Sequence, residues 1–126
     1  MVNISGERQA SLSIEIPFED WVARLSRDLS QEERDRLRLA WNRAQAAYSG
    51  RCGESGESYF QHALAVTALL ATLNLGTDAI IAGLLHSLPR VEAFEPELLA
   101  AELGEAVPNL IDGAMRVGTI GELHEP

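Results

Sequence analysis

The sequence contains no lysine and only one cysteine, and both shortages narrow the possible functions. All ten of its cationic side chains are arginine, so a P-loop, whose lysine contacts nucleotide phosphates, is excluded. Cys52 has no partner for an internal disulfide or a thiolate metal cluster, which favours a reducing compartment. No apolar run approaches the roughly 18 residues of a membrane-spanning helix, and the N-terminus does not read as a signal peptide. We therefore expect a cytoplasmic protein without membrane contact.

Negative charge predominates in the chain. Nineteen Asp and Glu residues against ten Arg give a formal net charge of −9. An acidic surface repels phosphate backbones, so we expect no direct binding to nucleic acid. Hydrophobic residues make up 46% of the 126 residues and charged residues 23%, which is typical of one globular domain rather than of a disordered chain.

Apolar residues recur at helical spacing along most of the chain, and we predict an all-α fold of about five or six helices with short connectors. Residues 1–16 are mostly polar and are expected to form an N-terminal arm. Helices are expected at residues 18–29, 31–48, 59–73, 79–88, 96–103 and 105–117. The stretch 79–88 is apolar on nearly every side, so it should lie at the centre of the core.

Capping residues and prolines predict where several of these helices begin and end. Ser30 and Glu33 form a capping box, in which each side chain satisfies a backbone N–H at the start of the helix. Ser58 and Gln61 repeat this pattern at the start of the next helix. Pro89 cannot continue an α-helix and should end the one before it.

The later caps and the inner faces of the helices follow from the same rules. Thr77 or Asp78 is expected to cap the helix at 79–88. The arginines of the longest predicted helix should be solvated and pair locally, as in Glu32–Arg36. Residues expected to face the core include Phe18, Trp21, Val22, Leu25, Leu29, Leu37, Trp41, Ala44, Tyr48, Val107, Leu110, Ile111 and Ala114.

His62 and His86 are the candidate residues for metal binding or catalysis. His62 belongs to a stripe that we expect to face inward, made of His62, Val66, Leu69 and Leu73. His86 follows the small residues Ala82 and Gly83, which would let another helix approach closely. Two such imidazoles could begin a metal site, but a hydrolytic divalent ion also needs carboxylates, and none is beside either histidine. Spacing alone therefore favours two hydrogen-bonded core histidines.

Three stretches of the sequence resemble the N-terminal HD domain of the RelA/SpoT family. The run 47–66 (AYSGRCGESGESYFQHALAV) is similar to the family signature A-H-x-G-Q-x-R-x-S-G-E-P-Y-I-x-H-P-L-x-V. Residues 78–87 (DAIIAGLLHS) resemble a helix ending in L-L-H-D, and 109–117 (NLIDGAMRV) resemble L-V-D-G-V-T-K-L. The resemblance implies an HD-domain-like helical bundle over 17–126, truncated at its C-terminal end and forming the N-terminal fragment of a longer multidomain protein.

Active members of that family hydrolyse the alarmone (p)ppGpp with manganese held by a histidine, an H-D pair and a later aspartate. A Glu-Asp pair after H-D serves the attacking water, and a basic residue before S-G-E packs on the guanine. The matching positions here are His62, His86 and Ser87 for the metal, Arg90 and Val91 for the water, and Gly53 for the guanine. The last ligand aspartate would lie beyond Pro126. Because two carboxylate ligands and the water-activating pair are missing, the resemblance implies a pseudo-hydrolase without catalytic residues or bound metal.

Degeneration of this kind resembles the RelA-type GTP pyrophosphokinases of the stringent response. In these proteins the HD domain is inactive, and an adjacent magnesium-dependent synthetase domain transfers pyrophosphate from ATP to GTP. The resemblance implies a structural and regulatory role toward that synthetase domain, which would be the partner of this chain. The surface that meets it should be apolar.

Two alternatives stay open at this level. One is a weak metal-dependent hydrolase of (p)ppGpp or another nucleotide, using His62, His86 and Asp112. The other is a dimerisation module that self-associates, in which Trp21 could be either a core residue or a contact residue.

Overall fold

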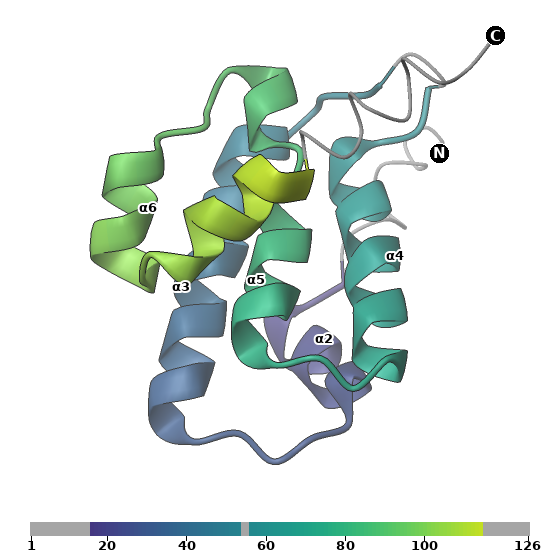
Figure 1. Cartoon of the computed structure of the whole chain (residues 1–126). Helices are drawn as coiled ribbons and strands as arrows, with labels where there is room; N and C mark the ends of the chain where they lie inside the picture. The colour runs from purple at the N-terminus through teal and green to yellow at the C-terminus, as the bar shows by residue number, and fades with distance from the viewer. Residues whose placement is uncertain (1–15, 54–55, 115–126) are drawn as a thin grey trace, which may run out of the picture.

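The computed structural model describes residues 16–53 and 56–114, which form a helical bundle (Figure 1). Its elements are α2 (Phe18–Leu25), α3 (Gln31–Tyr48), α4 (Tyr59–Thr72), α5 (Thr77–Leu85), the 3₁₀ helix η1 (Leu88–Val91), α6 (Pro96–Leu103) and helical residues 106–114. An isolated β-bridge between Cys52 and Ser58 is the only strand-like pairing in the described part of the chain. The all-α prediction is confirmed. The arm predicted for 1–16 lies, except for Ile16, outside the described residues.

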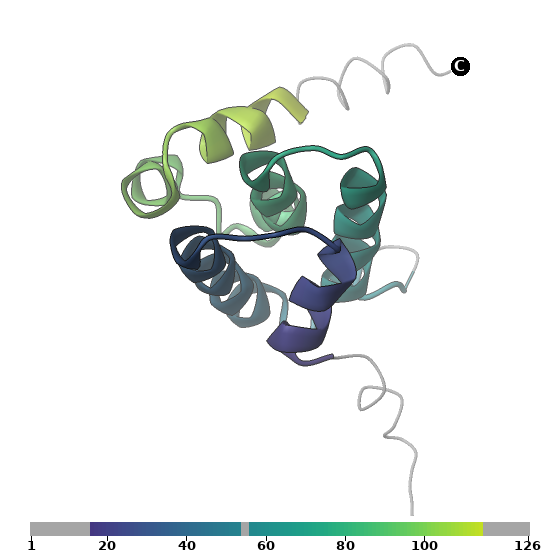
Figure 2. The same ribbon diagram turned by 90° about the horizontal axis from the view of Figure 1, so that it is seen from below.

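The helix α5 lies at the centre of the core, as predicted. It packs against both α3 and α4, and Figures 1 and 2 show it enclosed by the surrounding helices. Its residues Ile80, Ile81, Leu84 and Leu85 are almost completely buried. None of the described helices is long and apolar enough to cross a membrane.

An aromatic cluster joins α2, α3 and α4 on one side of the core. Trp41 contacts the rings of Phe18, Trp21 and Phe60, with centroids 5.0 to 5.9 Å apart. Trp21 is 3% exposed, and its Nε1–H donates to Thr67 Oγ1 at 3.0 Å. Trp21 is therefore a core residue and not a contact residue of a dimer.

Several predicted helix limits are confirmed. The capping box of Ser30 and Glu33 is present, and α3 spans 31–48 as predicted. The Ser58 side chain accepts a hydrogen bond from the Gln61 backbone N–H at the start of α4. The helix α6 begins at Pro96 and ends before Gly104.

Other predicted limits are wrong. The first helix ends at Leu25 rather than 29, because Ser26 adopts a left-handed conformation (φ 56°); Leu29 still packs against the core. The helix α5 ends at Leu85, ahead of the predicted 88, and Pro89 lies within η1. The Tyr48 hydroxyl accepts from the Ser87 N–H and donates to the Leu84 carbonyl. These are backbone groups that a continued α-helix would bond internally, so the helix ends early.

The inner face predicted for the last helix is half correct. Val107 and Ile111 are buried, but Leu110 is 45% exposed and Ala114 is exposed. Residues 107 and 111 are one turn apart and share a face, and 110 lies about 60° from 107 at the edge of that face. Residue 114 is on the same side as 107 but is the last residue described, one turn beyond Ile111.

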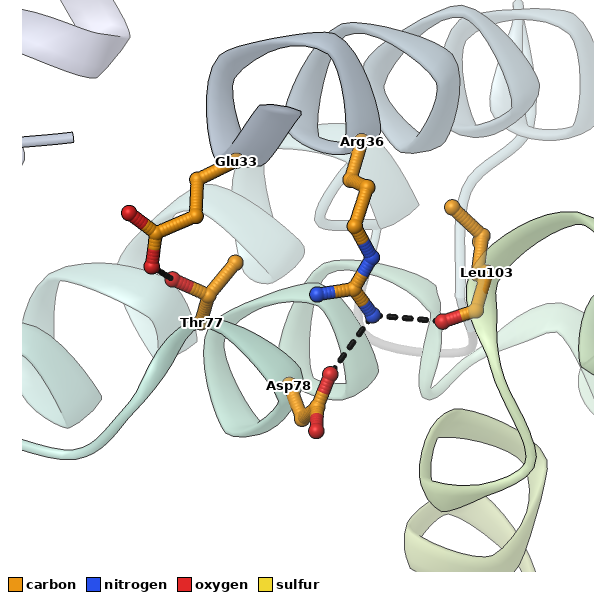
Figure 3. Close-up of polar contacts among 5 residues, drawn as sticks. All are labelled: Glu33, Arg36, Thr77, Asp78 and Leu103. Atoms are coloured by element: carbon orange, nitrogen blue, oxygen red, sulfur yellow. Dashed lines mark hydrogen bonds and ion pairs between the residues drawn. The ribbon is translucent and has the colours of Figure 1, made fainter. Parts of the chain in front are cut away.

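The expected cap of α5 is also wrong, because both candidate side chains bind other helices (Figure 3). Gly76 is the N-cap and supplies no side chain. The Thr77 hydroxyl donates to Glu33 Oε2 at 2.9 Å, and Asp78 Oδ1 accepts from Arg36 Nη2 at 2.6 Å. Arg36 also donates to the Leu103 carbonyl, so one guanidinium joins α3, α5 and α6. It is committed to these tertiary contacts rather than to the local pairing expected with Glu32.

Candidate functional site

The two histidines singled out in the sequence lie side by side. His62 is in the first turn of α4, and His86 follows directly after α5. Their ring centroids are 5.1 Å apart, with the planes tilted by 58°. The helices approach closely here because residue 83 is glycine: an added Cβ at Gly83 would lie 2.5 Å from Leu70 Cδ1 and 3.3 Å from Val66 Cγ1.

His62 does not face the core, contrary to our expectation. Its side chain is 45% exposed, and Leu69 and Leu73 of the same stripe are 61% and 60% exposed. The buried face of α4 consists instead of Phe60, Ala63 and Thr67. Because this helix is apolar on nearly all sides, its hydrophobic period could not identify the inner face.

A carboxylate also lies next to His62 in space, although none is adjacent in the sequence. Glu57 Oε1, from the glycine-rich loop before α4, is 3.6 Å from His62 Nδ1. Both side chains are about half exposed. The expectation that no carboxylate sits beside either histidine is therefore wrong for His62, and the loop is the reason, since it folds back toward the start of the helix.

His86 is held as a neutral imidazole. Its Nδ1–H donates to the Gly83 carbonyl at 2.7 Å, which leaves Nε2 to accept from the Ser87 hydroxyl at 3.3 Å. Burial lowers the pKa of His86, and the charges of His62 and Arg90 lower it further, against the opposing effect of the Gly83 carbonyl. Each of the two ring nitrogens of His86 therefore has a hydrogen-bond partner.

Ser87 is buried in a hydrogen-bonded cluster that includes a residue not singled out from the sequence. It is 1% exposed, and its backbone N–H donates to the Tyr48 hydroxyl at 3.2 Å. Tyr48 in turn donates to the Leu84 carbonyl at 3.0 Å, and burial raises the pKa of its phenol. The sequence placed Tyr48 only in the core stripe of α3. A tyrosine at a core position needs a hydrogen-bond partner for its hydroxyl. This requirement could have indicated from the sequence that Tyr48 takes part in a buried polar cluster.

The remaining positions carried over from the family resemblance are spread around this cluster. Arg90 is exposed on η1, while Val91 on the same element is 6% exposed and belongs to the core. Gly53 lies in the loop before α4, where its N–H donates to the Glu57 carbonyl and an added Cβ would meet the Tyr59 ring at 3.8 Å. A glycine offers no cation with which to pack on a guanine.

Asp112 is not combined with the histidines into a metal site. It is half-buried on the helix at 106–114, where it lines an open cleft of ≈ 540 Å³ with Phe94 and Pro96. Within residues 16–53 and 56–114, no three His, Cys, Asp or Glu side chains are arranged so that they could hold a metal ion. The set of His62, His86 and Asp112 considered above is therefore not assembled in this structure.

The residues around the two histidines do not fit a divalent hydrolytic ion. Manganese prefers octahedral coordination rich in carboxylate, carbonyl and water oxygens. Here Ser87 offers a neutral hydroxyl, both ring nitrogens of His86 have hydrogen-bond partners, and Glu57 is the one carboxylate in contact with the pair among the interactions described. Arg90 adds a positive charge that acts on His86, and this charge would also repel a cation.

A second cleft lies at the other end of α5 from His86. It is open, has a volume of ≈ 650 Å³ and is bordered by Arg36, Asp78 and Leu110. The Arg36 guanidinium already donates hydrogen bonds to Asp78 and to the Leu103 carbonyl. This cleft therefore does not present a free cation to a ligand.

Comparisons with known proteins identify the family of this chain and some of its relatives. Residues 40–126 match the family model described as HD domain. The chain is 34% identical over 74 residues to a guanosine-3′,5′-bis(diphosphate) 3′-pyrophosphohydrolase of Haemophilus influenzae, covering 59% of this chain and 11% of that protein. It is 31% identical over 84 residues to a GTP pyrophosphokinase of Streptomyces coelicolor, covering 67% of this chain and 10% of that protein. It is 29% identical over 89 residues to the bifunctional (p)ppGpp synthase/hydrolase SpoT of Escherichia coli, covering 71% of this chain and 13% of that protein. The chain thus spans only about a tenth of the length of these relatives.

Proposed function

Because the chain belongs to the HD-domain family and carries the form of that domain found in RelA/SpoT proteins, we propose that it is a hydrolytically inactive member. The observation that carries the proposal is the neutral cluster of Tyr48, His86 and Ser87 at the position where the resemblance places an H-D metal-binding pair. An aspartate at 87 would supply a negative charge to a cation, whereas the serine supplies a weak hydrogen bond to a neighbouring imidazole.

The electrostatics of the cluster support this proposal. Hydrolysis of a pyrophosphate ester requires a metal ion that holds the phosphate oxygens and lowers the pKa of a bound water. Holding such an ion requires anionic ligands, because its charge must be compensated when it leaves water. His86, whose pKa burial lowers, brings no negative charge, and Arg90 stands where the resemblance places an acidic residue that would assist the water. One half-exposed carboxylate, Glu57, does not replace two ligand carboxylates.

We further propose that the chain acts on a synthetase domain of the same protein. Relatives of this chain are named as GTP pyrophosphokinases and as synthase/hydrolase enzymes, and all are several times longer than 126 residues. In this proposal the parent protein is a GTP pyrophosphokinase of the stringent response in the cytoplasm, and its magnesium-dependent chemistry belongs to the other domain. The HD domain docks on that domain and restrains it.

Two exposed leucines support a docking surface on the side of the bundle formed by α6 and the helix at 106–114. Leu98 and Leu110 are 40% and 45% exposed, and a large apolar side chain exposed to water gains free energy when a partner covers it. A cleft lined by residues of both helices includes the carboxylates of Glu97 and Glu105, so these two helices also present negative charge to a partner.

The experiment is to add the purified chain to the separately purified synthetase domain of its parent protein. We expect saturable binding by calorimetry and a changed rate of pyrophosphate transfer. The variant L98E/L110E should weaken both effects by about tenfold or more, since it places charges in an apolar contact. No heat of binding together with an unchanged synthesis rate would contradict the proposed role.

A further inference from the structure

The helix α6 is attached to α3 through two arginines of α3. The Arg43 guanidinium forms an ion pair with Glu102 in the last turn of α6, and its Nη1 lies 4.0 Å from Oε1 of Glu95, the N-cap of α6. Arg36, about two turns before Arg43 on the same face of α3, donates to the Leu103 carbonyl. Figures 1 and 2 both place α6 at an edge of the bundle. We call the group of Arg43, Glu95 and Glu102 the α6 latch.

The α6 latch is a weak attachment. The side chains of Glu95 and Glu102 are 65% and 32% exposed, so water and salt screen both ion pairs. The Nε–H of Arg43 is buried and has no hydrogen-bond partner among the described residues. A buried donor without an acceptor raises the free energy of the folded state, and water would satisfy this donor once α6 moved away from α3. The residue that holds α6 therefore also carries an unsatisfied group that release would relieve.

The backbone around α6 permits it to move separately. Among the backbone hydrogen bonds described, none joins residues 94–103 to another helix. An open cleft of ≈ 540 Å³ is lined by both α6 and the helix at 106–114, so these two helices are not closely packed along that side. Glu92 before α6 and Gly104 after it have left-handed backbone conformations, with φ of 59° and 96°. Both are residues at the ends of elements, the kind of position that absorbs the backbone rotation of a hinge.

Two buried leucines oppose this movement. Leu99 and Leu103 are 0% and 2% exposed, and they are the only buried residues of α6, whereas α5 has six buried residues out of nine. Because the free energy of burial scales with apolar area, separating α6 costs less than unfolding the core. We propose that α6 releases from α3 as one unit while α3, α4 and α5 stay folded, and that the α6 latch controls how often it does so.

Release would change the surface that the domain offers to a partner. Leu98 is on α6 and Leu110 is on the helix at 106–114, so movement of α6 alone separates these two exposed leucines. It also uncovers Leu99 and Leu103. A partner that binds one arrangement better than the other would shift the balance between them. The release of α6 itself does not depend on the proposed docking role, and its test needs no partner.

Native-state hydrogen exchange of the whole chain tests the release of α6, with α5 as the internal reference. A helix of eight residues is unstable on its own, so the amides of α6 exchange when it leaves α3. We expect them to exchange at least about tenfold faster than the amides of α5. Raising the salt concentration to about 1 M should accelerate α6 further relative to α5, because salt screens the ion pairs of the α6 latch.

Glu102→Gln leaves the Arg43 guanidinium without its closest carboxylate, and it should accelerate exchange in α6 by about three- to tenfold without affecting α5. Adding Arg43→Met to that variant should return the α6 rate toward the wild type, because it removes the charge left unpaired. The matched control is Glu19→Gln, which changes the net charge equally but breaks the ion pair with Arg34 between α2 and α3. It should leave exchange in α6 unchanged.

Three results would overturn the inference. The first is equal protection of α6 and α5 in the wild type, which would mean that α6 leaves only when the whole domain unfolds. The second is a Glu102→Gln variant that accelerates α5 as much as α6, or that leaves α6 unchanged. The third is a double variant in which α6 exchanges faster than in Glu102→Gln alone.

Discussion

Replacement of Trp41 by alanine is expected to lower the free energy of unfolding by about 3–5 kcal/mol, the usual cost of truncating a buried tryptophan. Trp41 is 2% exposed and contacts three other aromatic rings. Those contacts join α3 to α2 and to α4, so the cavity would separate three helices at once. A domain of this size has a total stability of about 5–15 kcal/mol, so this loss would remove about a fifth or more of the total.

Urea unfolding followed by circular dichroism measures this loss. Trp41→Phe is the matched control, because it keeps an aromatic ring at the centre of the cluster and should cost about 1–2 kcal/mol. A loss below about 1 kcal/mol for the alanine variant, which is the range of an average substitution, would show that the aromatic cluster does not hold the helices together.

Tyr48→Phe is expected to lower the free energy of unfolding by about 1–3 kcal/mol, because it leaves buried backbone groups unsatisfied. The hydroxyl bonds both the Leu84 carbonyl and the Ser87 N–H. Its removal leaves the volume of the core almost unchanged, so the effect reports on hydrogen bonds rather than on packing. Tyr48 thereby fixes the backbone conformation of the residues that follow α5, from His86 onward.

Two measurements distinguish this role from general destabilisation. Amide exchange at Ser87 should accelerate more than exchange in α3, since the N–H loses its acceptor. Tyr59→Phe is the control: its ring is 6.0 Å from that of Tyr48 but is only half-buried, and its loss should stay within about 0.5 kcal/mol. Equal stability of the wild type and Tyr48→Phe would contradict the structural role of the cluster.

Local signals in the sequence identified those parts of the fold in which capping, length and hydrophobic period agree. The helix α3 is an example, because Ser30 and Glu33 specify its start and its apolar stripe of Leu37, Trp41, Ala44 and Tyr48 is buried throughout. The central position of α5 was also predictable, since a helix that is apolar all round has to be surrounded.

Contacts between distant residues could not be predicted in the same way. Thr77 and Asp78 have the chemistry of helix caps, but Glu33 and Arg36, more than 40 residues away, bind them instead. The inner face of α4 was ambiguous because alanine and leucine occur on both of its sides. The proximity of His62 and His86 followed from small residues on α5, but the Glu57 contact depends on a loop conformation that no periodic pattern encodes.

The most direct test of the central claim is an assay of (p)ppGpp hydrolysis with manganese, using the pyrophosphohydrolase of Haemophilus influenzae named above as the positive control. We expect no release of pyrophosphate above the buffer blank and no manganese-dependent rise in the melting temperature, because the Tyr48, His86 and Ser87 cluster offers a cation no compensating charge. Turnover that requires manganese and disappears in His86→Ala would contradict the proposed inactivity.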